Sequence, residues 1–161
     1  MPPVRMLSGL PDAAAHLLYY FGNLGGQYTI RLQAMIDDVP SAKRVFAREV
    51  EMAKGFTETL DNGIHRITSG SVSPGYNLKT ENWNWYYAVG GYSAWGKGTA
   101  EVYGDCYTLE MEYKVFDRYN WDAGKFVKIL GQEVTDEFMG TFHKQGLAQE
   151  FDMNGSVKKT I

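Results

Sequence analysis

One short segment of the chain, from Phe116 to Gly124, concentrates side chains that can do chemistry. It follows the clearest predicted strand, Tyr107–Val115. The chemically active groups are Asp117, Arg118, Tyr119, Asn120, Trp121 and Asp122. A plain turn needs Asn, Asp and Gly but has no need of Arg, Tyr and Trp, and loops held by a rigid strand often carry function. The segment therefore predicts either a functional loop or an Asx-rich turn whose aromatic rings pack on the sheet.

The oxygen atoms of this segment suit a hard divalent cation. Asp117, Asn120 and Asp122 are close in sequence, so they could share one Mg²⁺ or Ca²⁺. They do not match the EF-hand calcium loop, because no glutamate closes it at the right place. A cation held there would polarise a phosphoryl oxygen or activate water. Arg118 could hold a phosphate, although it and Asp117 point to opposite sides if the strand continues through them.

Other kinds of catalytic site have little support in the sequence. His16, His65 and His143 lack metal-ligand spacing, which argues against a multi-histidine metal site. His143 falls in the last turn of a predicted helix, where a cation interacts well with the helix dipole. Cys106 is the only cysteine, so the chain can form neither an internal disulfide nor a CxxC motif. No GxSxG motif indicates acyl transfer.

Length, charge and hydropathy limit the class of protein. The chain has 161 residues, of which 44% are hydrophobic and 22% charged, as expected for one globular domain. Its net charge of −3, without a long basic run, argues against a nucleic-acid partner held through phosphate contacts. We expect no signal peptide at Met1–Gly9 and no transmembrane segment, so action outside the cytoplasm would need another delivery route.

The hydrophobic pattern predicts helices first and strands afterwards. Helices are expected at Pro11–Phe21, across Tyr28–Ile36 and at Ser41–Leu60, with a later helix capped by Thr135. Strands are expected at Ile64–Val72, Trp83–Val89, Tyr92–Gly98, Thr99–Tyr103, Tyr107–Val115, Phe126–Leu130, Gln149–Met153 and Gly155–Thr160. We predict an α+β fold, with N-terminal helices packed on a curved antiparallel sheet and one further helix near the C-terminus.

The order of elements also predicts the domain organisation. Residues 1–10 are expected to form a flexible lead-in and residues 11–161 a single domain. Within that domain, residues 11–60 are the helical part and residues 64–161 the mainly β part.

Several stretches resemble the catalytic domain of the colicin M family. Ala14–Asn23 is similar to the helix that opens that domain, and Val89–Tyr92 to a Gly- and Tyr-containing strand. Asp117–Asn120 stands where the family carries Asp-x-Tyr-Asp, and Gly146–Gly155 resembles the closing strand. The resemblance covers all but the first dozen residues. A second resemblance, from Tyr113 to Gly155, is to the C-terminal domains of polymorphic toxins, which secretion systems deliver on contact.

The resemblance implies an antibacterial toxin that acts on the cell envelope. Colicin M-like bacteriocins use a divalent metal to hydrolyse lipid II between undecaprenol and pyrophosphate. The implied partners are lipid II, the membrane surface and a cognate immunity protein, but no nucleic acid. The implied location is secretion or delivery to the periplasm of target bacteria. The implied cofactor is Mg²⁺ or Ca²⁺.

Carried over by residue, the resemblance also implies a site. Asp117 and Tyr119 match the family motif, whereas Asn120 replaces its second Asp. The family's later His-Arg pair is absent, since residues 123–127 read Ala-Gly-Lys-Phe-Val. Asp122 is the expected replacement for the missing carboxylate and His143 for the missing imidazole. The expected catalytic set is Asp117, Tyr119, Asn120, Asp122 and His143; the expected substrate-binding residues are Arg118 and Trp121; the expected metal ligands are Asp117 and Asp122.

Two alternatives to hydrolysis stay open from the sequence. One is a secreted effector or interaction module without this chemistry that acts on membranes, with the predicted strand Trp83–Tyr87 as an interfacial aromatic belt. The other is an immunity or scaffold protein, which would be harmless when expressed in the periplasm.

Overall fold

The chain forms two compact units. The computed structural model describes residues 9–23, 25–76, 81–120, 126–129, 132–135, 140–141, 143–146 and 148–161. Unit 1 comprises Met1–Tyr28, Leu78–Gly90 and Asp117–Met153, and unit 2 comprises Thr29–Asn77, Gly91–Phe116 and Asn154–Ile161. The candidate site residues that can be described lie in unit 1.

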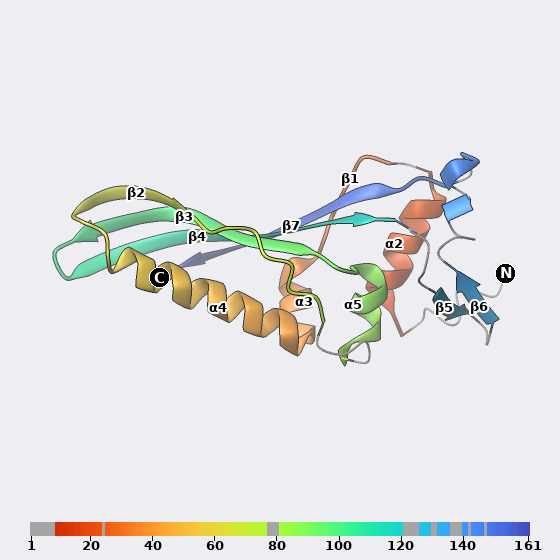
Figure 1. The fold of residues 1–161 in the computed structure, drawn as a ribbon, viewed down its shortest axis with the longest axis horizontal. Helices are drawn as coiled ribbons and strands as arrows, with labels where there is room; N and C mark the ends of the chain where they lie inside the picture. Colours follow the sequence, from red (N-terminus) through yellow and green to blue (C-terminus); the bar gives the residue numbers. More distant parts are fainter. Residues whose placement is uncertain are drawn as a thin grey trace. The chain divides into compact units, whose positions relative to one another are not determined.

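Unit 2 is a helix packed on a twisted antiparallel sheet. Helix α4 (Pro40–Thr57) lies along one face of strands β2 (Gly63–Thr68), β3 (Ser93–Tyr103) and β4 (Cys106–Tyr119), as Figure 1 shows. These strands pair antiparallel. Helix α3 (Leu32–Asp38) precedes α4. Alternate β4 residues face inward, and the core contains Val50, Ala100, Leu109 and Met111.

Unit 1 contains two helices that hold each other by a side-chain cap. These are α2 (Pro11–Phe21) and α5 (Trp83–Ala88), and Figure 1 shows them next to each other. A separate hairpin consists of β5 (Phe126–Ile129) and β6 (Gln132–Thr135). Residues 140–141 and 143–144 are helical, which confirms the predicted helix-like segment near the C-terminus.

The main sheet has five strands in the order β1-β7-β4-β3-β2. Strand β1 (Gln27–Thr29) is short, and β7 (Phe151–Thr160) is the single long strand that replaces the predicted final strand or hairpin. The bonds from Asp152 N to Gly26 O and from Ile30 N to Asn154 O advance together along both strands, which is the pattern of a parallel pair. The predicted α+β class is confirmed. Strand β1 pairs parallel to β7, whereas the other strands of the sheet pair antiparallel.

The predicted strand at Trp83–Val89 is wrong, because this stretch forms helix α5. The Asn82 side chain caps the helix by accepting a hydrogen bond from Trp85 N at 3.1 Å. The buried residues Asn84, Trp85 and Ala88 fall at i, i+1 and i+4, a helical face. Trp85 is fully buried, whereas Trp83 is 41% exposed. The rings of Trp83–Tyr87 therefore do not form a belt on a strand.

Four further details differ from prediction. Strand β4 continues four residues beyond the predicted end and includes Tyr119, so the expected loop does not begin at Phe116. Tyr28 lies in β1 rather than on a helical face shared with Leu32. Thr135 ends β6, and the residues that it was expected to cap are largely outside the described ones. Val72 lies beyond the end of β2 and forms only an isolated bridge to Ala94.

Candidate active site

The end of strand β4 sets the directions of the motif side chains. Burial along the strand alternates through its last residues: Asp117 is half-buried, Arg118 is exposed and Tyr119 is buried. Successive side chains of a strand point to opposite faces. Asp117 and Tyr119 therefore share one face, and Arg118 projects from the other. The sequence analysis predicted that Asp117 and Arg118 point to opposite sides if the strand continues through them.

An aromatic layer fixes the Tyr119 face in unit 1. The Tyr119 ring, 7% exposed, stacks on Phe151 with centroids 4.8 Å apart and an interplanar angle of 9°. Tyr20 lies 5.8 Å from the Tyr119 ring, and His16 meets it edge-on at 6.2 Å. Offset and edge-to-face pairs of this kind add to the free energy gained by burial. The layer gives Asp117, two residues away, a rigid strand to project from.

His16 is a buried imidazole that the sequence alone did not single out. It is 1% exposed and packs edge-on against Tyr28 at 4.5 Å. Its Nδ1 lies 2.7 Å from the Ala88 carbonyl oxygen, which can only accept, so Nδ1 carries the proton. Burial lowers the pKa of His16, opposed by that hydrogen bond and by the charge of Asp12. The ring is therefore neutral near pH 7. In the sequence, the clue to this buried residue is that His16 is a polar residue among the Leu, Tyr and Phe residues of an amphipathic helix.

Asn84 ties helix α5 to the start of helix α2. Its Oδ1 accepts hydrogen bonds from Asp12 N at 2.8 Å and Ala13 N at 3.1 Å, while its Nδ2 donates to Asp12 Oδ2 at 2.9 Å. Amides in the first turn of a helix have no partner within it. A side chain distant in sequence thus does the work of a local cap and holds the helix that carries His16.

The opposite face of β4 carries a charged cluster. Arg118 Nη1 lies 2.8 Å from Asp152 Oδ1, and Arg118 Nη2 lies 3.5 Å from Glu150 Oε2. One guanidinium faces two carboxylates, so this trio has a net charge of 1 − 2 = −1. A phosphate that contacts the Arg118 guanidinium would share it with these carboxylates. The predicted substrate contact of Arg118 therefore competes with two existing ion pairs.

His143 joins this cluster through Glu150. The Glu150 backbone N–H donates to His143 Nδ1 at 3.1 Å, so the proton of the neutral ring lies on Nε2. That nitrogen is 4.0 Å from Glu150 Oε2. His143 and Arg118 are thus brought together by Glu150, a carboxylate that the sequence reading did not select. The available signal was the alternation of Glu150 and Asp152 with buried Phe151 and Met153.

The remaining predicted residues are only partly placed. Asn120 is half-buried directly after β4, whereas Trp121 and Asp122 lie outside the described residues. Within the described ranges, no group of three or more His, Cys, Asp or Glu side chains is arranged to hold a metal ion. Asp117 is the one member of the predicted metal pair that the structure places. Helices in the described part of the chain include none that is long and apolar enough to cross a membrane.

Comparisons with known proteins place the chain among remote structural neighbours. No family model matches it, and no curated protein sequence matches it significantly. It is similar to the solved structure of PaeM, a colicin M-like bacteriocin produced by Pseudomonas aeruginosa, with a TM-score of 0.46 and 13% identity over 93% of this chain and 50% of that chain. It is also similar to pectocin M2, with a TM-score of 0.37 and 13% identity over 96% and 50% of the two chains.

The chain therefore spans about half the length of the solved structures that it matches. PaeM belongs to the family that the sequence resembles, so the structural comparison finds this chain remotely similar to a colicin M-like bacteriocin.

Proposed function

We propose that this chain is the catalytic part of an antibacterial toxin of the colicin M type, which hydrolyses lipid II between undecaprenol and pyrophosphate. The observation that supports the proposal is the common face of Asp117 and Tyr119 at the end of β4. These are the two residues that match the family motif. A carboxylate held on a rigid strand beside a fixed phenol suits general-base chemistry on a phosphoester.

In this proposal Asp117 accepts the proton of the attacking water. The water oxygen bonds to phosphorus, the bond from phosphorus to the undecaprenyl oxygen breaks, and the leaving oxygen must receive a proton. His143 carries its neutral-state proton on Nε2, but it lies with Arg118 and Glu150 on the face of β4 away from Asp117. In this proposal the leaving oxygen therefore takes its proton from water. Tyr119 positions the substrate through its hydroxyl, which the stacked ring holds in place, while Asn120 and Asp122 complete the polar set.

A divalent cation is part of the proposal. Asp117 and Asp122 would hold it, with Mg²⁺ or Ca²⁺ as the candidates, because carboxylate oxygens suit both ions. When bound, such an ion polarises a phosphoryl oxygen. The partners would be lipid II at the membrane surface and an immunity protein in the producing cell. Action would be in the periplasm of the target.

The test is undecaprenol release from lipid II by the purified protein, with Mg²⁺, with Ca²⁺ and with chelator. We expect release only with a metal ion, and loss of release in Asp117→Asn. Asp37→Asn is the matched control, because Asp37 is an exposed carboxylate at the end of α3 in unit 2. Full release by Asp117→Asn would remove the base from the proposal, and no release by the native protein under any metal would end it.

A membrane-acting module without hydrolysis is the second candidate. It is favoured by large apolar side chains exposed on the helices of unit 1, namely Leu18, Phe21 and Trp83 at 68%, 42% and 41% exposure. Trp83 stacks on Tyr87 at 5.5 Å and 21°. Dye release from anionic vesicles, lost in Trp83→Ala and independent of Asp117, would favour this function over hydrolysis.

A further inference from the structure

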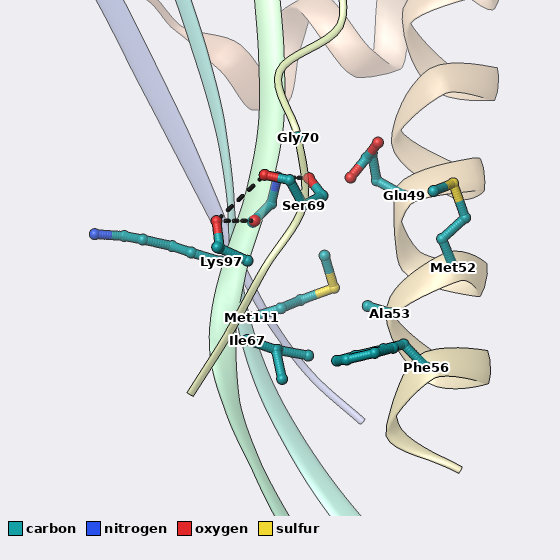
Figure 2. Close-up of a pocket in the computed structure, with 11 residues that line it drawn as sticks. Glu49, Met52, Ala53, Phe56, Ile67, Ser69, Gly70, Lys97 and Met111 are labelled. Atoms are coloured by element: carbon teal, nitrogen blue, oxygen red, sulfur yellow. Dashed lines mark hydrogen bonds between the residues drawn. The ribbon is translucent and has the colours of Figure 1, made fainter. Parts of the chain in front are cut away.

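Unit 2 contains a pocket that is separate from the residues of the proposed active site. Helix α4 and strands β2, β3 and β4 surround a cavity of about 250 Å³ (Figure 2). Its wall is largely apolar and is formed by Met52, Ala53, Phe56, Ile67 and Met111. Pockets for drug-sized ligands start at about 300 Å³. This pocket therefore suits a single aliphatic chain better than a nucleotide or a sugar.

One carboxylate faces this apolar cavity. Figure 2 shows the Glu49 side chain directed from α4 toward the strands. Glu49 is 5% exposed, and among the described residues none donates a hydrogen bond to its carboxylate or pairs with it. A Cβ at Gly96 would lie 3.4 Å from Glu49 Oε2, so the glycine leaves room for the carboxylate beside β3. A buried carboxylate without a partner is costly.

The polar groups that flank Glu49 are engaged with one another. Gly96 N donates to Ser69 Oγ at 2.8 Å, and Ser69 N donates to Gly96 O at 2.8 Å. Thr68 Oγ1 donates to the same Gly96 oxygen at 3.3 Å. Lys97 points away from Glu49 in Figure 2, and its Nζ lies 3.8 Å from Glu112. No cation from these neighbours neutralises the carboxylate.

The charge of Glu49 acts on a buried residue of unit 2, Tyr113. Burial raises the pKa of Tyr113, and the charges of Tyr92 and Glu49 act in the same direction. Removing water from this region strengthens every charge interaction in it. A ligand that brings a positive group to Glu49 would therefore be bound selectively.

We propose that this pocket binds a primary ammonium group carried on an unbranched apolar chain. The ammonium donates hydrogen bonds to Glu49, and the chain lies against Met52, Phe56 and Met111. A free alkylamine and the lysine side chain of a partner protein share this chemistry. Because the pocket lies in unit 2, the inference does not depend on lipid II hydrolysis.

The test is NMR titration of protein carrying ¹³C-methyl methionine, read at Met52 and Met111. We expect n-hexylammonium to shift both methyl signals saturably and to bind at least about tenfold more tightly than n-hexanol, because a charge-assisted hydrogen bond is added. n-Hexanoate should cause no shift. Equal affinities for the amine and the alcohol would overturn the proposal.

Three variants locate the effect. Glu49→Gln keeps the shape and should remove the preference for the amine over the alcohol, whereas Ala53→Leu fills the cavity and should abolish binding of both. Glu51→Gln is the matched control, because Glu51 lies on the same helix but is exposed and paired with Lys54 at 3.0 Å. Unchanged amine binding in both Glu49→Gln and Ala53→Leu would overturn the site.

A final comparison separates the two sources of the ammonium group. A short lysine peptide and its N-acetyllysine counterpart are titrated in the same way. Tighter binding of the lysine peptide than of n-hexylammonium indicates a protein partner, and tighter binding of n-hexylammonium indicates a small amine. Failure of both would refute the proposal and would leave the hydrolase assay unaffected.

Discussion

Tyr119 allows a structural role to be separated from a catalytic one. Its ring is 7% exposed and stacks on Phe151 at 4.8 Å. Tyr119→Ala removes a buried aromatic ring and should lower the free energy of unfolding by about 3–5 kcal/mol. Tyr119→Phe keeps the ring and removes only the hydroxyl, so it should cost about 1 kcal/mol. If the phenol contributes to the reaction, Tyr119→Phe should nevertheless reduce lipid II hydrolysis by about 100-fold.

Tyr113 is the matched control for both substitutions. It lies on the same strand, is 1% exposed and packs on Phe46 at 5.2 Å in unit 2. Urea unfolding followed by far-UV circular dichroism should give similar losses at the two positions, while undecaprenol release should fall only for Tyr119→Phe. Full release by Tyr119→Phe would exclude the phenol from catalysis. A loss below about 1 kcal/mol for Tyr119→Ala would refute the supporting role of the ring stack.

Three other predictions concern the groups around the motif. Asn84→Ala should cost about 2–4 kcal/mol in urea unfolding, because it removes three buried hydrogen bonds to Asp12 and Ala13. Asn62→Ala, which removes one exposed bond, should cost under about 1 kcal/mol. Arg118→Ala should change stability by less than about 1 kcal/mol, because the side chain is 48% exposed. Because burial lowers the pKa of His16, the unfolded chain takes up a proton on this imidazole at a higher pH than the folded chain does. The free energy of unfolding should therefore decrease below pH 6.5, with a slope of at most about 1.4 kcal/mol per pH unit. His16→Gln should remove this part of the slope, and an unchanged pH profile in that variant would contradict the prediction.

The strongest periodic patterns predicted the fold well. Helix α2 and most of α4 begin and end close to the expected residues, because apolar side chains recur there at helical spacing. Strand β4 shows the expected alternation of buried and exposed residues. Helix α5 was missed because alternating aromatics over a few residues fit a strand and a short helix equally well. Its cap at Asn82 is a local signal that sequence reasoning missed, whereas the bond from Asn84 to α2 is a tertiary contact that one sequence does not reveal.

The candidate site was only partly predictable for the same reason. The alternation along β4 predicts that the side chains of Asp117 and Arg118 point to opposite faces, provided that the strand continues to Tyr119. The partners of Arg118 come from β7 and the residue before it, some thirty residues later, and no local spacing points to them. His16 and Glu49 are polar residues on the buried faces of α2 and α4, and only the structure shows that each is buried. Polar residues that interrupt an apolar face were therefore the signal to follow.

The charge balance of the two faces of β4 bears on the metal requirement. Pyrophosphate is a polyanion and needs positive charge to be held. Arg118 lies on the face away from Asp117, and the two carboxylates beside it leave that cluster at −1. The cation for the substrate should then come from an ion on the Asp117 face. We expect Arg118→Ala to retain most metal-dependent release while chelator abolishes release. Loss of release in Arg118→Ala with unchanged stability would show instead that the guanidinium leaves its carboxylates and binds the substrate.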